Sequence, residues 1–186
     1  MPVIELDTER LLLRQWKDSD LPEFASLNSD PFVMNFFPEV LSRDASNAIA
    51  KKFRSLITER GWGFWATELK SNGNFIGFIG IHEHPTKFSF SPCTEIGWRL
   101  ARPYWGKGYA TEAATKVLEF SFVTLNLDEV VSFTAMQNTK SRAVMTRLGL
   151  TDTNQNFGHP DIPKTHPLSQ HVLYKLTKAE WQESRS

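Results

Sequence analysis

The sequence has a single cysteine, no surplus of charge and no long hydrophobic run. Cys93 is the only cysteine among 186 residues, which excludes an intramolecular disulfide and favours a plain structural thiol. Basic residues number 21 and acidic residues also number 21, so no global field favours a nucleic acid or an anionic membrane as a partner. No apolar run approaches the ~20 residues of a transmembrane helix, and residues 1–5 lack the organisation of a signal peptide. We therefore predict a cytoplasmic protein that binds neither nucleic acid nor membrane.

The composition is typical of one folded domain. Hydrophobic residues make up 40% of the chain, enough to enclose a sizeable core without disulfides. No repeat, low-complexity tract or linker divides the sequence, so we predict that residues 1–186 form a single domain. The polar, proline-interrupted segment 154–169 is expected to be a long ordered loop that covers part of the protein.

Hydrophobic periodicity predicts strands and helices in a mixed order. Asp44 and Gly61 are residue types that begin and end helices, and Asn72-Gly73 favours a tight hairpin because both residues accept positive φ. The hairpin indicates a largely antiparallel sheet, which a crossover through a helix then extends. The predicted strands are residues 10–16, 62–69, 75–82, 94–101, 130–135 and 170–176, and the predicted helices are residues 18–28, 45–60, 109–125 and 139–148.

The most informative stretch, residues 95–113, runs from a predicted strand through a glycine-rich turn into a helix. The change of periodicity falls at Gly106-Lys107-Gly108. Glycines carry no Cβ, so successive N–H groups and the positive end of the helix dipole can converge on phosphate oxygens. We therefore predict a diphosphate-binding turn, with a glycine turn that has no ligand as the alternative.

Two common diphosphate sites do not fit this turn. A nucleotide P-loop needs Ser or Thr directly after Gly-Lys, but Gly108 follows Lys107. A Rossmann fingerprint needs Gly or Ala three places after its second glycine, and Thr111 stands there. A nucleotide-hydrolysing P-loop protein and a Rossmann oxidoreductase are both disfavoured.

Four segments carry a likeness that spans nearly the whole chain: residues 8–14, 104–113, 138–141 and 171–174. Together they resemble the RimJ/RimL-like branch of the GNAT acyl-CoA-dependent N-acetyltransferases. The turn matches the family pattern at Gly106 and Gly108, whereas Pro103 stands where the family has Gln or Arg. The resemblance implies an α/β (α+β) fold with a mixed, mostly antiparallel seven-stranded sheet and helices on both faces. It also implies a splay between the fourth and fifth strands, where acetyl-CoA inserts as cosubstrate.

The resemblance also implies which residues contact acetyl-CoA. The amides of the turn hold the pyrophosphate, and Asn138 contacts the pantetheine arm. Free strand N–H groups polarise the thioester carbonyl, and basic side chains near the turn meet CoA phosphates or remain solvated. The expected set is Trp98, Leu100, Trp105, Gly106, Lys107, Gly108, Tyr109, Ala110, Asn138, Ser141 and Arg142.

Transfer of an acyl group to an amine needs a base, a polarised carbonyl and a stabilised leaving thiolate. The resemblance places the general base at Glu95, for which a surface ion pair is the alternative role. Many relatives have a tyrosine as the acid seven residues after the asparagine, but Met145 stands there and cannot donate a proton. Ser141 is the next candidate, although a serine in the first turn of a helix is often a cap.

The remaining candidates lie in the aromatic residues and in the loop before the last strand. Asp161 is the reserve base. His159, His166 and His171 have spacings that fit no common zinc signature, so we expect no metal. Aromatic residues at high density usually form core, but some could line the acceptor site: Phe36, Phe37, Trp62, Phe64 and Trp65.

These features predict an acetyl-CoA-dependent N-acetyltransferase that modifies a primary amine. A protein N-terminal α-amine is the leading acceptor and a small-molecule amine is the alternative, because fold does not fix substrate. No nucleophile for an acyl-enzyme is evident, so we expect direct attack in a ternary complex of a monomer or homodimer. A non-catalytic acyl-CoA-binding module is the other hypothesis, and amine-dependent release of the CoA thiol separates the two.

Overall fold

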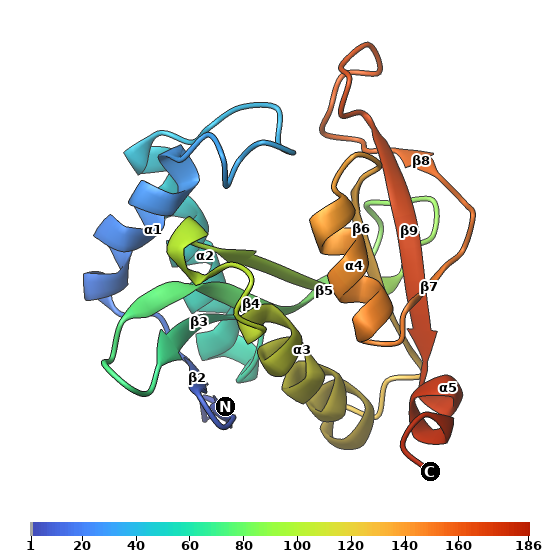
Figure 1. Ribbon diagram of the computed structural model, residues 1–186, viewed down its shortest axis with the longest axis horizontal. Helices are drawn as coiled ribbons and strands as arrows, with labels where there is room; N and C mark the ends of the chain where they lie inside the picture. Colours follow the sequence, from blue (N-terminus) through green and yellow to red (C-terminus); the bar gives the residue numbers. More distant parts are fainter. Residues whose placement is uncertain (1) are drawn as a thin grey trace.

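The computed structural model describes residues 2–186, in which nine strands form one sheet (Figure 1). Met1, which the single-domain prediction includes, lies outside the described residues. The fold class is confirmed, although the described residues form nine strands rather than the expected seven, and three of the nine have only two residues each. Along the sheet the order is β1 (Leu6–Asp7), β2 (Leu11–Arg14), β3 (Phe64–Leu69), β4 (Phe75–His84), β5 (Cys93–Leu100), β6 (Glu129–Ala135), β9 (Gln170–Thr177) and β7 (Thr151–Asp152), with β8 (Phe157–Gly158) also paired to β9.

The junction between β5 and β6 divides the sheet into two halves. Every other strand pair is antiparallel, whereas β5 and β6 are parallel and register at a single pair, Glu95 with Val131. The Ser132 hydroxyl donates a hydrogen bond of 2.9 Å to the Ile96 carbonyl next to this pair. Beyond it the two strands run in clearly different directions (Figure 1). The expected splay is confirmed, and β5 and β6 are the strands that diverge.

Helices cover both faces of the sheet, as expected. Arg99 of β5 bonds to a side chain of α1, whereas Trp98, which points to the opposite face, bonds to a side chain of α4. The helices are α1 (Leu21–Ser29), α2 (Arg43–Arg60), α3 (Tyr109–Glu119), α4 (Thr139–Arg147) and α5 (Lys178–Glu183), with single 3-10 turns at Asp18–Asp20 and Arg102–Tyr104 and a π-helical turn at Phe120–Thr124. None of these helices is long and apolar enough to cross a membrane.

Two local predictions need correction. Ser42, not Asp44, caps α2, because the Ser42 hydroxyl accepts the Ala45 N–H at 3.2 Å and Asp44 lies within the first turn. The expected tight hairpin at Asn72-Gly73 is a longer turn. Gly73 has φ of 73°, but Asn72 is not left-handed and instead accepts the Asn74 N–H at 3.0 Å through its side chain. In both cases a side chain accepts a backbone N–H two or three residues further along the chain, and this local bond sets the backbone conformation.

The core on the α1 and α2 face is aromatic. The rings of Trp16 and Phe24 lie 4.9 Å apart, and those of Phe53, Phe64 and Phe78 form a triangle with centroid separations of 5.0 to 5.1 Å. Phe64, which we considered for the acceptor site, is buried in this core. Trp65, which we also considered, is buried on the opposite face of the sheet, with its ring 5.6 Å from that of Phe120. Aromatic packing on the α1 and α2 face holds β3 and β4 firmly against the helices.

A buried ion network joins the first strands to α1. Arg14 is 4% exposed and donates to both Asp20 oxygens, at 2.8 and 2.9 Å, and to Glu68. Burial raises the pKa of Glu68, but the hydrogen bond and charge of Arg14 outweigh it and hold that pKa below its ordinary value. Removal of the guanidinium would leave a buried carboxylate without a counter-charge.

We predict that Arg14→Met lowers the free energy of unfolding at pH 7 by about 3–5 kcal/mol in urea titrations. The folded pKa of Glu68 lies below its unfolded value, so the loss is complete above an unfolded pKa of 4.5 and shrinks as the pH falls through the folded pKa. Arg54→Met is the control, because Arg54 pairs with an exposed Asp18 and should cost at most ~1 kcal/mol. Equal losses of unfolding free energy in the two variants would contradict the role of Arg14 as the counter-charge of buried carboxylates.

Candidate functional site

The glycine turn presents a row of free backbone donors. Gly106 and Gly108 have φ of 70° and 80°, and Gly108 is the left-handed N-cap of α3. Within residues 2–186, none of the N–H groups from Gly106 to Thr111 donates a hydrogen bond to the protein. A Cβ at Gly106 would meet no atom within 4 Å, so the backbone is open on that side. Together with the N-terminal end of the α3 dipole, this arrangement suits a multiply charged anion.

An ion pair from the start of the chain fixes the turn. Glu112 in the first turn of α3 accepts the Thr8 hydroxyl at 2.7 Å, the Arg10 N–H at 2.8 Å and Arg10 Nε at 2.6 Å. Arg10 Nη1 also donates to the Lys107 carbonyl at 3.0 Å, and its guanidinium lies 4.5 Å from the Tyr109 ring. Burial raises the pKa of Glu112, but these donors outweigh it and lower that pKa overall. Sequence reasoning missed Arg10 and Glu112, because their pairing depends on the β1–β2 connection reaching α3.

The edge of β5 beyond the β6 junction carries free backbone groups. Even-numbered residues of β5 point away from β4, because Ile96 offers its carbonyl to β6 and the hydrogen-bonding direction alternates along a strand. Trp98 and Leu100 therefore turn their N–H groups toward the region that β6 vacates. The Leu100 carbonyl is already used, since Trp105 Nε1 donates to it at 2.8 Å. Trp105 thus connects the free strand edge to the glycine turn.

Asn138 and Ser141 lie across from this edge at the start of α4. The Asn138 side chain caps α4 by accepting the Ser141 N–H at 3.2 Å, and its amide donates to Thr134 at 2.9 Å. The Ser141 hydroxyl takes no part in the cap, and it accepts Trp98 Nε1 at 3.1 Å. Among residues 2–186 no group accepts the hydroxyl hydrogen of Ser141, which is available to another acceptor. Met145, at the position of the absent tyrosine, is buried in the core.

Glu95 is paired with a histidine that sequence reasoning did not single out. Its Oε2 lies 2.7 Å from His84 Nε2, and both side chains are largely buried. The antiparallel register sets His82 directly opposite Glu95 and puts His84 on the same face two residues further along. The His82 ring stacks on Phe64, and burial together with nearby positive charge lowers the pKa of His82 to about 4. The signal in the sequence that could have revealed this pair is the alternation of His82 and His84 at the end of the strand that precedes the one with Glu95.

The remaining candidates lie near the loop before β9. Asp161 pairs with Lys87, whose hydrogen bond holds the pKa of Asp161 below its ordinary value, so the reserve base is occupied. Burial and the neighbouring His171 lower the pKa of His159 to about 4. In the part of the chain that the structure describes, no three His, Cys, Asp or Glu side chains are grouped to hold a metal ion.

Three basic side chains flank the start of α4 and the turn in different ways. Lys140 lies 4.7 Å from the Trp105 ring and Lys107 lies 5.9 Å from the Tyr104 ring, so both stay beside the turn. Arg142 is directed elsewhere, to the Tyr174 hydroxyl, the Met136 carbonyl and Asp152. The two lysines are therefore better placed than Arg142 to meet an anion at the turn.

These features define an open α/β domain whose parallel strand pair separates beside an anion-binding turn. The chain belongs to the family described as the acetyltransferase (GNAT) domain, whose model matches residues 10–151. The protein is accordingly an acetyl-transferring enzyme, and members of this family use acetyl-CoA as the donor.

Relatives support the assignment over most of the chain. The uncharacterized N-acetyltransferase YnaD of Bacillus subtilis is 27% identical over 96% of this chain and 99% of its own length. The FsC-acetyl coenzyme A-N(2)-transacetylase of Aspergillus fumigatus is 31% identical over 83% of this chain and 68% of its own. A crystal structure of an acetyltransferase from Agrobacterium tumefaciens is 30% identical, with a TM-score of 0.76 over 95% of each chain.

We predict that Gly108→Ala weakens acetyl-CoA binding at least tenfold, because a side chain at φ of 80° strains the turn that presents the free N–H groups. Isothermal titration calorimetry measures the affinity. Gly73→Ala is the matched control, since Gly73 has φ of 73° and open space around it but lies far along the chain from the turn. Both variants should lose similar stability, and only Gly108→Ala should lose affinity. Unchanged affinity in folded Gly108→Ala would place the diphosphate elsewhere.

Proposed function

We propose that this protein transfers the acetyl group of acetyl-CoA to a primary amine by direct attack in a ternary complex. The single observation that carries the proposal is the divergence of β5 from β6, which leaves a free strand edge beside a turn of unpaired N–H groups. An acetyl donor with a diphosphate at one end and an amide-containing arm at the other can bond to the N–H groups of the turn and to the free strand edge at the same time.

The residues of this chain divide between the two ends of the donor. The N–H groups of Gly106 to Ala110 would hold the diphosphate, with Lys107 and Lys140 nearby. The free β5 edge at Trp98 and Leu100 would pair with the pantetheine arm and polarise the thioester carbonyl. Asn138 fixes the start of α4 through one bond at each polar atom, and the second N–H and second lone pair of its amide would contact the pantetheine arm.

Glu95 is the base of the proposed reaction, with His84 as its partner. The carboxylate takes the proton of the substrate ammonium directly or through water, and the amine nitrogen then attacks the thioester carbon while the carbon–sulfur bond breaks. The hydrogen bond to His84 orients the carboxylate. Cys93 lies two residues away on the same strand, but burial raises the pKa of its thiol, so an acyl-cysteine is disfavoured.

Ser141 is the proposed donor to the leaving thiolate. Trp98 Nε1 occupies a lone pair of the Ser141 oxygen at 3.1 Å, which turns the hydroxyl hydrogen toward other acceptors. The hydroxyl contacts the Trp98 side chain of β5 from the first turn of α4, and we place the thioester sulfur within its reach. A hydrogen bond from Ser141 would stabilise the sulfur anion as it forms.

The acceptor is proposed from the RimJ/RimL-like resemblance, because similar folds serve different acceptors. Solved neighbours include a ribosomal-protein-S5-alanine acetyltransferase from Vibrio fischeri and a spermidine N-acetyltransferase from Vibrio cholerae, each 18% identical. A protein N-terminal α-amine, as in the RimJ/RimL-like branch, is the leading acceptor, and a small-molecule amine is the second. We also propose that the protein is cytoplasmic and acts as a monomer or a homodimer.

We predict that Glu95→Gln lowers kcat by about 10²- to 10⁴-fold and leaves the dissociation constant for acetyl-CoA unchanged, because the amide cannot accept the ammonium proton. A thiol-release assay with saturating acetyl-CoA and a panel of amines and peptides measures the rate. The rising limb of the wild-type pH profile should be absent in the variant.

Glu83→Gln is the control for this measurement. Glu83 is a carboxylate on the neighbouring strand that pairs with Arg60, so its variant should keep wild-type turnover. Wild-type turnover and an unchanged pH limb in Glu95→Gln would remove Glu95 from the mechanism. Acetyl-CoA binding without thiol release for any amine would instead favour the binding-module hypothesis.

A further inference from the structure

Arg99 is a charged residue of β5 that the proposed chemistry does not use. It lies on the same face of the strand as Glu95, four residues along, with Gly97 between them. Within residues 2–186, no carboxylate oxygen approaches an Arg99 nitrogen within the 4.0 Å of an ion pair. Burial lowers the pKa of Arg99 to about 10, and Glu95 is the acidic group that counteracts this effect. A guanidinium in this position is costly unless something pairs with it.

The partners of Arg99 hold it in place but leave one edge free. Nη1 donates to Asn28 Oδ1 at 2.8 Å, and the fully buried Asn28 in turn donates to Ser46 at 2.9 Å. Nε is buried without a hydrogen-bond partner, and Nη2 has none among the described residues. Nε and Nη2 form the side of the guanidinium that binds a carboxylate through two parallel hydrogen bonds. The anchored side is therefore Nη1, and the free side is the bidentate one.

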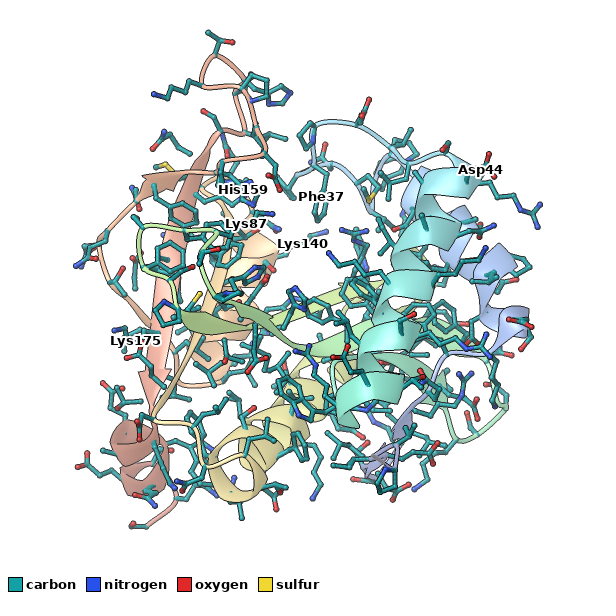
Figure 2. The ribbon with its side chains drawn as sticks, turned by 180° about the vertical axis from the view of Figure 1, so that it is seen from behind. Phe37, Asp44, Lys87, Lys140, His159 and Lys175 are labelled. Carbon is teal, nitrogen blue, oxygen red and sulfur yellow. The ribbon has the colours of Figure 1, made fainter. Side chains whose placement is uncertain are left out.

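The surroundings of Arg99 include Phe37, one of the aromatic residues that we considered for the acceptor site. Its guanidinium carbon lies 4.3 Å from the Phe37 ring and 5.4 Å from the Phe78 ring. Figure 2 shows Phe37 projecting from the loop after α1 into the space between the two halves of the molecule, with Lys140 and His159 across from it. Phe37 is 40% exposed, so an aromatic ring that covers Arg99 is itself open to solvent. A ring in this position can stack on the guanidinium and move aside for a ligand.

Glu95 leans toward Arg99 along the strand. A Cβ built at Gly97 would lie 3.4 Å from Glu95 Oε1 and 3.3 Å from the Phe64 ring, so the Glu95 carboxylate extends over Gly97. The two Cα atoms, four residues apart, are separated by ~13 Å at the rise of an extended strand. The Glu95 oxygen that does not contact His84 and the Nε–Nη2 edge of Arg99 thus face a common stretch of the sheet. One small molecule or the end of one peptide can reach both.

We propose that Arg99 binds a carboxylate of the acceptor, so that the amine acetylated at Glu95 belongs to a molecule that also carries an acidic group. The inference rests on the proposed function and narrows its acceptor. A cationic acceptor such as a polyamine would bring a second positive charge toward an unpaired guanidinium, which is unfavourable. An acidic amine supplies the missing counter-charge and satisfies Nε and Nη2 together.

The test compares matched amines that differ in one carboxylate. One arm uses γ-aminobutyrate against butylamine, and the other uses the C-terminally amidated peptides Ser-Glu-Ala and Ser-Gln-Ala, so the arms distinguish a small acid from an acidic protein N-terminus. We expect the wild type to favour the acidic member of at least one pair by at least tenfold in kcat/KM. Arg99→Gln should reduce that preference by roughly 10- to 100-fold, mainly through KM, with the neutral member unaffected. Arg99→Lys should keep part of the preference for the acidic amine, because lysine retains the positive charge but lacks the two parallel N–H donors of the guanidinium.

Arg60→Gln is the matched control, since Arg60 also lies over an aromatic ring, 4.0 Å from Trp62, but already has Glu83 as its partner. This variant should keep the wild-type preference. A retained acetyl-CoA thermal shift shows that each variant is folded. Equal rates for acidic and neutral amines, or an equal loss for both in Arg99→Gln, would overturn the inference while the transferase stands. If none of the amines releases the CoA thiol, both the proposed function and this inference are overturned.

Discussion

The unpaired edge of β5 is the constraint on which the rest of the structure depends. A strand in the middle of a sheet normally bonds on both sides, because an unpaired backbone group shielded from water costs about as much as a lost hydrogen bond. Here β5 keeps β4 on one side and loses β6 after Glu95. The free groups at Trp98 and Leu100 are tolerable if water or a ligand bonds to them. An extended amide-containing arm is the ligand that best replaces a missing strand.

The elements around this edge hold it open from both sides. Trp98 bonds to Ser141 of α4, and Trp105 bonds to the Leu100 carbonyl, so indole N–H groups connect β5 to the start of α4 and to the turn. Arg10 and Glu112 tie the same turn to the beginning of the sheet. The site is therefore preorganised by side chains that need not touch the reacting atoms. Preorganisation of this kind reduces the reorganisation that must accompany the reaction.

The sequence allowed the local parts of this arrangement to be predicted. The glycine turn, the splay and the placement of Glu95 on the strand before the turn depend on residues within about 40 positions of one another, and periodicity or family likeness indicates them. His84, Arg99 with Asn28, and Arg10 with Glu112 were missed because each depends on register or packing between separate elements. Asp44 and Asn72 were misjudged for a different reason, since the Ser42 side chain supplies the cap and the Asn72 side chain alters the turn.

A crystal structure of the protein with acetyl-CoA tests the central claim most directly. The account predicts diphosphate oxygens within hydrogen-bond distance of the N–H groups from Gly106 to Ala110. It also predicts pantetheine amides paired with the free edge of β5 at Trp98, and the thioester between that edge and Ser141. Acetyl-CoA bound away from β5, or a β6 that closes onto β5 and pairs with Trp98 and Leu100, would contradict the account.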